Sequence, residues 1–168
     1  VNASEFLNDK LSKAVTVNKK SGKINVNSAL LYPNSTTSIS NGVKLPDSYK
    51  IIVNASSASQ NFHGKQTIEL KITPAKLSIK GLENKASIPV AYVIYGDPAN
   101  FELESTQNVS ADMSWAIENQ SAVGTDVSLN SNVIKFTANA GDPNKKTEKA
   151  YDVTPVLLKD GFRVASST

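Results

Sequence analysis

The sequence predicts an all-β domain, because short segments in which apolar and polar residues alternate recur between clusters of turn-forming residues. The strictest segment runs from Thr67 to Ile72. Its apolar residues lie two positions apart, so they should share one face of a half-buried strand. Pro74 should end this strand, because proline cannot donate a hydrogen bond to a β-ladder.

Further segments of the same kind are short, separated by turns and rich in Val, Ile and Tyr. They are Lys23 to Val26, Tyr49 to Val53, Leu77 to Ile79, Pro89 to Tyr95, Met113 to Ile117, Val133 to Thr137 and Tyr151 to Leu158. Many short strands at this spacing are typical of a β-sandwich or a β-barrel. We expect the former, an immunoglobulin-like antiparallel β-sandwich.

Two pairs of segments predict β-hairpins, because turn residues separate two runs of alternating residues. The first hairpin joins Val15–Val17 to Ile24–Val26 across Ser21 and Gly22. The second joins residues 156–158 to residues 162–164 across Asp160 and Gly161. Neighbouring strands should therefore be antiparallel.

The N-terminal residues 1–17 are predicted to form an arm ahead of one Ig-like domain over residues 18–168. Ser4 precedes Glu5 and a short apolar pattern that includes Phe6, Leu7 and Leu11. A serine before such a pattern is typical of a capped helix, so a short amphipathic helix is expected there.

Composition excludes several classes of protein. The chain has 18 basic and 15 acidic residues, but Arg163 is its single arginine, so a nucleic-acid partner is not expected. It has no cysteine, which excludes disulfides, thiolate metal sites and cysteine nucleophiles. No apolar stretch is long enough for a membrane span.

Catalytic constellations are not recognisable. His63 is the single histidine and is expected in a loop, and no nucleophile-elbow motif surrounds any serine. Glu102 and Glu104 should share one face of a strand, where a carboxylate pair could serve glycoside hydrolysis or simply form a polar surface. Trp115 lies within a predicted strand and is expected in the core. We therefore predict no enzyme, and no catalytic, cofactor-binding or metal-binding residues.

The C-terminal third resembles the last two strands of fimbrial pilins of the chaperone-usher type. The resemblance rests on Val133 to Ala138, a polar insert from Gly141 to Lys149, and Tyr151 to Leu158. The middle of the chain is also similar, with Lys65 to Ile72 as one strand and Ile88 to Val90 opening another. Gram-positive pilins with Lys–Asn isopeptide bonds would share the sandwich and the lack of cysteine, and stay an alternative.

The resemblance implies an incomplete Ig-like sandwich, completed by an edge strand that a neighbouring subunit donates. Such a donor has apolar residues two apart near one terminus. The candidates are Leu11, Val15 and Val17 at the N-terminus, and Phe162 and Val164 at the C-terminus. Implied partners are neighbouring copies of the chain or related subunits, and an assembly chaperone.

The expected function is that of a structural subunit of a bacterial surface fibre involved in cell adhesion, located outside the cell or on its surface. The alternative is a self-contained Ig-like adhesin or spacer module of a cell-surface protein, with a host glycan or protein as its receptor. The first predicts assembly through donated strands, and the second predicts a stable monomer.

Overall fold

The computed structural model describes residues 3–39, 42–56, 63–81, 98–137 and 151–166, and the structure is mostly β, as the sequence predicted. The chain divides into two compact units, Val1–Thr73 and Pro74–Thr168, and each is described by itself. The sequence had suggested a boundary after Val17. The structure instead groups the N-terminal helix with the residues that follow it, up to Thr73.

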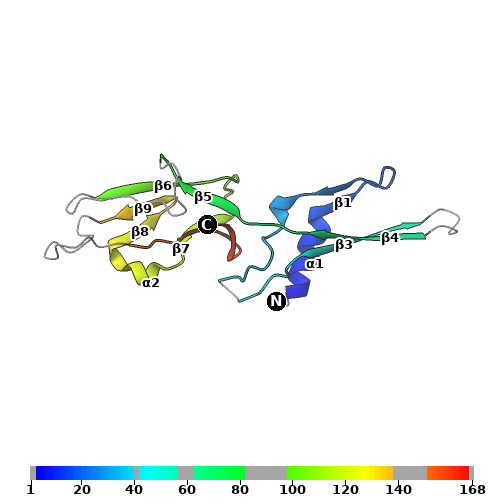
Figure 1. Ribbon diagram of the computed structural model, residues 1–168, viewed down its shortest axis with the longest axis horizontal. Coiled ribbons are helices and arrows are strands. Elements are labelled where there is room, and N and C mark those ends of the chain that lie inside the picture. Colours follow the sequence, from blue (N-terminus) through cyan, green and yellow to red (C-terminus); the bar gives the residue numbers. More distant parts are fainter. Residues whose placement is uncertain (1–2, 40–41, 57–62, 82–97, 138–150, 167–168) are drawn as a thin grey trace. The chain divides into compact units, whose positions relative to one another are not determined.

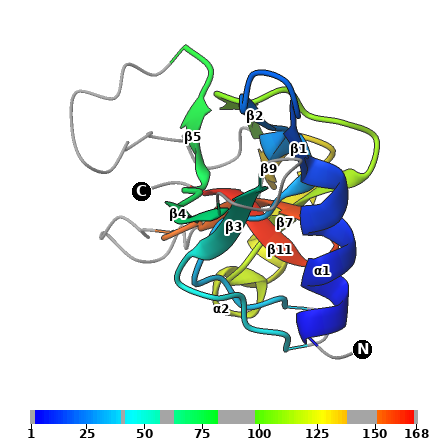
Figure 2. The ribbon, with the colours of Figure 1, turned by 90° about the vertical axis from the view of Figure 1, so that its right-hand side faces the viewer.

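The first unit contains one longer helix and two small antiparallel sheets. Its elements are α1 (Ala3–Ala14), β1 (Val15–Val17), β2 (Ile24–Val26), the 3-10 helix η1 (Ser28–Leu30), β3 (Tyr49–Ser56) and β4 (His63–Leu70). Helix α1 runs directly into β1 (Figure 2). The sequence-predicted helix is therefore present, and it continues to the first strand.

Strands β1 and β2 form the first predicted hairpin, which is confirmed. Val15 lies opposite Val26 and Val17 opposite Ile24. The side chain of Asn18 closes the turn, because its Oδ1 accepts from the main-chain N–H groups of Lys20 and Ser21, both at 3.0 Å.

Strands β3 and β4 form a long two-stranded ribbon (Figure 1), in which Tyr49 lies opposite Leu70 and Ser56 opposite His63. His63 is thus the first residue of β4, where we had expected a loop. The strand ends at Leu70, two residues earlier than predicted. The reason is that Ile72 binds Asn34 and not β3. The N–H of Ile72 donates to Oδ1 of Asn34, and the main-chain N–H of Asn34 donates to the carbonyl oxygen of Ile72.

The base of this ribbon is held by a buried tyrosine. Tyr49 is 2% exposed, and its hydroxyl donates to the carbonyl oxygen of Tyr32 at 2.8 Å. Burial raises the pKa of the Tyr49 hydroxyl, because the phenolate would lose its hydration.

The second unit is built on one mixed sheet. Its elements are β5 (Ala75–Ile79), β6 (Ala99–Ser105), β7 (Met113–Ile117), the short helix α2 (Gln120–Val123), the 3-10 helix η2 (Gly124–Asp126), β8 (Val127–Asn130), β9 (Val133–Phe136), β10 (Pro155–Lys159) and β11 (Phe162–Ser166). The seven strands follow the order β7-β10-β11-β5-β6-β9-β8. Strands β7 and β8 end this order, yet they also contact each other, so the sheet curls towards closure.

Strand β5 divides its pairing between two neighbours. Ala75 and Lys76 pair in parallel with Ala165 and Ser166 of β11. Residues 77–79 pair antiparallel with β6. One strand of five residues therefore joins β7, β10 and β11 to β6, β9 and β8.

The core of the second unit lies inside the curled sheet. The buried cluster contains Leu103, Ile117, Val123, Val127 and Ile134, and Trp115 and Phe136 are among the half-buried residues that pack against it. The ring of Phe136 meets the rings of Phe101 and Tyr151 edge-on, each at a centroid distance of 5.7 Å. Such edge-to-face aromatic contacts are favourable beyond the area they bury.

Most sequence-predicted strands of this unit are confirmed, and β7 has the predicted bounds. The second predicted hairpin is also confirmed as β10 and β11, with Asp160 and Gly161 at φ values of 49° and 80°, as the favoured two-residue turn requires. Strand β10 begins at Pro155 and not at Tyr151, because Asn119 binds the main chain at Asp152 and Thr154. The predicted strand from Pro89 to Tyr95 lies outside the described residues.

We predict that Tyr49→Phe lowers the free energy of unfolding of the first unit by about 0.5–1.5 kcal/mol, the usual net value of one hydrogen bond. Because the folded pKa of Tyr49 lies above 10.0, its contribution is complete below pH 10.0 and is lost as the pH rises through the folded pKa. The difference between wild type and variant should therefore shrink in alkali. Urea unfolding followed by circular dichroism on both sides of pH 10.0 measures it. A constant difference across this range would contradict the assignment.

Candidate functional site

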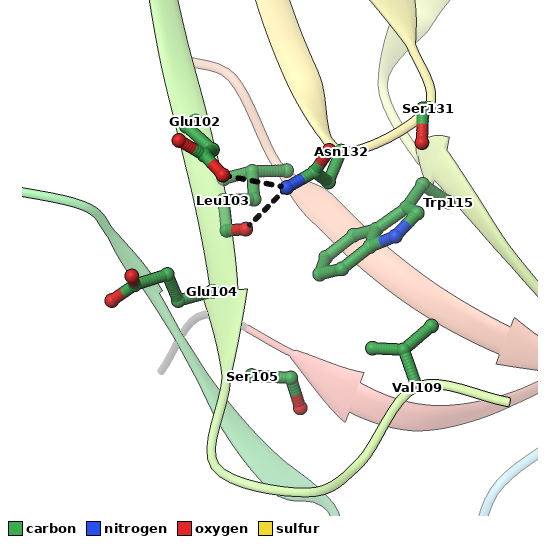
Figure 3. Close-up of a pocket in the computed structure, with 8 residues that line it drawn as sticks. All are labelled: Glu102, Leu103, Glu104, Ser105, Val109, Trp115, Ser131 and Asn132. Atoms are coloured by element: carbon green, nitrogen blue, oxygen red, sulfur yellow. Dashed lines mark hydrogen bonds between the residues drawn. The ribbon is translucent and has the colours of Figure 1, made fainter.

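A hollow of about 510 Å³ lies on the second unit, between β6, the loop after β6, β7 and the turn from β8 to β9. Its lining consists of Glu102, Leu103, Glu104, Ser105, Val109, Trp115, Ser131 and Asn132. Figure 3 shows the indole ring of Trp115 in the hollow, between β6 and the turn that carries Ser131 and Asn132. The hollow therefore combines one aromatic surface with a polar rim.

Asn132 fastens the turn to β6. Its side-chain Nδ2 donates to the carbonyl oxygen of Leu103 at 3.0 Å. The main-chain carbonyl oxygen of Asn132 accepts from the N–H of Leu103 at 2.7 Å. The preceding Ser131 has a positive φ of 54°, which suits a tight turn between two strands. The polar side of the hollow is thus positioned by main-chain bonds.

The predicted carboxylate pair does share one exposed face of β6. Glu102 forms an ion pair with Lys80, with 2.9 Å between Oε2 and Nζ, and Asn132 Nδ2 lies 3.5 Å from its other oxygen. The hydrogen bond and charge of Lys80 lower the pKa of Glu102, and the same contact raises the pKa of Lys80. The contact therefore favours the charged form of each group.

This arrangement does not suit the acid role in glycoside hydrolysis. A general acid needs a carboxyl group whose pKa is raised, whereas the pKa of Glu102 is lowered. The carboxylate of Glu104 points away from Trp115 in Figure 3, towards the β5 side of the strand. The pair behaves as a charged rim of the surface.

Trp115 contacts the core on one side and lines the hollow on the other. It packs against the buried core cluster, as the sequence predicted, and lies opposite Leu157 in the neighbouring strand. The same residue is only half-buried, so part of the ring remains open to the hollow. Sequence reasoning missed the hollow, because the residues across it come from a turn far along the chain.

The N-terminal candidates for a donated strand do not lie in one strand. Leu11 is in α1, whereas Val15 and Val17 are in β1. The helix holds Leu11 in place, and an Asp9–Lys13 ion pair of 2.9 Å supports its last turn. Spacing alone had placed all three on one extended segment, and this part of the expectation is corrected. Whether residues of this arm are donated to a neighbour stays a prediction.

The C-terminal candidates lie inside the sheet of their own unit. Phe162 and Val164 belong to β11, which pairs with β10 on one side and with β5 on the other. Their side chains are 1% and 5% exposed. Donation of this strand to another subunit would have to remove it from both neighbours.

The first unit contains a second kind of candidate surface, which the sequence analysis did not identify. Val17, Val26, Ile52 and Ile68 are exposed by 37–54% on its two hairpins. Ile51, Ile52 and Val53 are consecutive, so at least one of them must face away from the side that the others share. This run of three apolar residues is the sequence feature that could have predicted an exposed apolar residue in the ribbon.

Comparison with protein families, curated proteins and solved structures finds no match for this chain. Among the described residues, no group of three or more His, Cys, Asp or Glu side chains is placed to hold a metal ion. No helix in the described part of the chain is long and apolar enough to cross a membrane. The hollow and the exposed hairpins are therefore the surfaces on which a function can be argued.

We predict that Lys80→Met raises the pKa of Glu102 towards its ordinary value of 4.5, because the main cause of the lowered pKa is removed. The stability due to Glu102 is present above that ordinary pKa and lost as the pH falls through the folded pKa. The stability due to Lys80 is present below 10.5 and lost as the pH rises through its folded pKa. Carboxyl titration by NMR measures the change, with Lys44→Met as a control that should leave Glu102 unaffected.

Proposed function

We propose that this chain is a structural module of a bacterial cell-surface protein, and that residues 74–168 are a self-contained Ig-like unit within it. The observation that carries the proposal is the strand order of the second unit. In Ig domains of the constant type, strands A, B, E and D form one sheet, and strands C, F and G form the other.

The seven strands of the second unit fit this scheme when β5 to β11 are taken in chain order as A to G. Strands β5, β6, β9 and β8 then follow the order A, B, E, D, and β7, β10 and β11 follow C, F, G. Strand β5 pairs with both sets, which supports a strand that crosses from one sheet to the other. Strand β11, which pairs in parallel with β5, therefore fills from within the chain the position that a donated strand would take.

This arrangement supports the self-contained module over a unit that waits for a donated strand. A donor would add at the position next to β10 or next to β5, and β11 already occupies both. A fibre subunit remains compatible with the proposal if its contacts with other subunits lie outside residues 74–168. The proposed role is adhesion or spacing at the cell surface, and not catalysis.

The test is to produce residues 74–168 alone and the shorter fragment 74–160, which lacks β11. The first should be a monomer with a cooperative thermal transition, and the second should fail to fold until a peptide of residues 162–166 is added. Light scattering and thermal melting measure both. A fragment 74–168 that stays unfolded, or that folds only after the peptide is added, would contradict a self-contained module.

The hollow at Trp115 favours a second role for the same module, recognition of a glycan. An aromatic ring beside amide, hydroxyl and carboxylate groups offers a sugar both an apolar surface and hydrogen-bond partners. Val109, which lines the hollow, is 47% exposed, so the hollow can be reached from solvent on this side. The ligand class would be a neutral or amino sugar, since a carboxylate borders the site.

Trp115 is the single tryptophan of the chain, so its fluorescence reports on the hollow without background from other sites. We expect saturable fluorescence changes on addition of oligosaccharides, and a binding constant weakened by Val109→Asp, which alters the exposed edge while leaving the core intact. Ile39→Asp, at an exposed apolar residue of the first unit, is the matched control. Unchanged fluorescence across a panel of glycans would remove this role and leave the structural one.

A further inference from the structure

The β3–β4 ribbon has the properties of an incomplete sheet. Its eight cross-strand pairs join two strands that have no third strand among the described residues. Ile52 and Ile68 are 54% and 37% exposed on it. A two-stranded sheet is marginally stable in water, and a third strand or a covered apolar face is usually needed. An exposed edge strand of this length is also a template for pairing with another chain.

We propose that two copies of this chain associate by antiparallel pairing of their β4 edges, with Thr67 of one copy opposite Thr67 of the other. The result is a four-stranded sheet in which neither copy gives up a strand. The contact therefore differs from strand donation, because it is symmetric and uses the same residues of both copies.

The side chains of the ribbon limit the register of this pairing. Ile51, Val53 and Ile68 lie on one face of the ribbon, because Ile51 is opposite Ile68 and Val53 is two positions from Ile51 in the same strand. Side chains directly opposite each other in neighbouring strands point to the same face of a sheet. The apolar faces of two copies therefore form one surface only when even-numbered residues of one β4 lie opposite even-numbered residues of the other. This condition leaves a few registers, which differ in how they place the charged residues.

The register centred on Thr67 is the one that brings opposite charges of β4 itself together. It places Lys65 of each copy opposite Glu69 of the other, on the same face as Thr67, so the dimer contains this pair twice. A register centred on Ile68 would place Lys65 opposite Lys71, and like charges directly opposite each other are destabilising. The edge of β3 offers no charge pair, since centring on Ile52 would place Lys50 opposite Asn54.

At the centre of the β4 edge, a side chain binds a main-chain oxygen that a neighbouring strand could bind instead. The side-chain Nε2 of Gln66 donates to the carbonyl oxygen of Thr67 at 3.2 Å. An N–H of a neighbouring strand can take the place of this amide, because the main-chain groups of Lys65, Thr67 and Glu69 point to the same edge of a regular strand. Glu69 also accepts a hydrogen bond from Ser48 at 2.6 Å through Oε1, on the side of β3, so pairing with Lys65 of a second copy would use the other carboxylate oxygen or a turned side chain.

Sedimentation equilibrium of the full chain over a wide range of concentration tests the proposal. Wild type should show a monomer–dimer equilibrium. Lys65→Glu and Glu69→Lys should each weaken it by about tenfold or more, because each places two like-charged pairs across the interface. Lys44→Glu makes the same change of charge at an exposed residue outside the ribbon and should dimerise like wild type.

Mixing the two variants gives the decisive measurement. In a mixed dimer, the glutamate introduced at position 65 of one copy faces the lysine introduced at position 69 of the other. The unchanged Glu69 of the first copy then faces the unchanged Lys65 of the second, so association should return towards wild type. Circular dichroism of each variant alone checks that the chain is folded, and a folded variant that regains association only in the mixture supports the register.

Three results would overturn the proposal: a wild type that is monomeric at all concentrations, a Lys65→Glu variant that associates as strongly as wild type, or a mixture that does not recover. Persistent association of Lys65→Glu would place the contact on another surface. The proposed function concerns residues 74–168 and is tested on that fragment, so failure of either experiment does not decide the other.

Discussion

The second unit depends on the way one short strand shares its hydrogen bonds. Ala75 and Lys76 of β5 pair with β11, and the next three residues pair with β6. Without this division, β7, β10 and β11 would form one sheet and β6, β9 and β8 another, each with an exposed edge. The curl that encloses Leu103, Ile117 and Ile134 therefore rests on a few main-chain bonds at the start of the unit. Packing then stabilises what the pairing has arranged, since burial of apolar side chains supplies most of the favourable free energy.

The first unit lacks such a bridging strand, and its exposed residues follow from that. Its two small sheets each contain two strands, so each strand keeps one edge without a partner among the described residues. The buried residues gather near the base of the ribbon, where Tyr49 reaches Tyr32, while Ile52 and Ile68 lie exposed farther along it. The same type of sequence pattern thus yields one curled seven-stranded sheet in the second unit and separate two-stranded sheets in the first. The proposed contact between copies is a consequence of this difference.

Local sequence features predicted local structure well. The bounds of β7 and both hairpins could be predicted, because alternation and turn residues act over a few neighbouring positions. The division after Thr73 could not, since only four residues separate β4 from β5 and none of them is glycine or serine. The ends of β4 and β10 were also misplaced. Both are set by asparagine side chains, Asn34 and Asn119, that bind main chain more than thirty residues away.

The candidate site shows the same limit. Residue spacing predicted that Glu102 and Glu104 share a face, and it predicted that Trp115 lies in a strand. It could not supply Lys80 or Asn132, because Lys80 follows β5 and Asn132 lies in the turn between β8 and β9, each more than twenty residues from Glu102. Those partners shape the site, since Lys80 lowers the pKa of Glu102 and Asn132 binds the turn of the hollow to β6. The pKa of Glu102 therefore depends on a contact that residue spacing does not encode.

The parallel pair of β5 and β11 has a mechanical consequence for the second unit. Strand β5 begins the second unit and β11 ends its described part, and the two point in the same direction. Tension applied to the two ends of the unit would pull these strands in opposite senses along their length. The hydrogen bonds between them would then carry the load together, in shear, and would not open one after another as in a hairpin pulled from its open end. The parallel pair that joins the two halves of the sheet would thus also be loaded in shear when the unit is pulled at its ends.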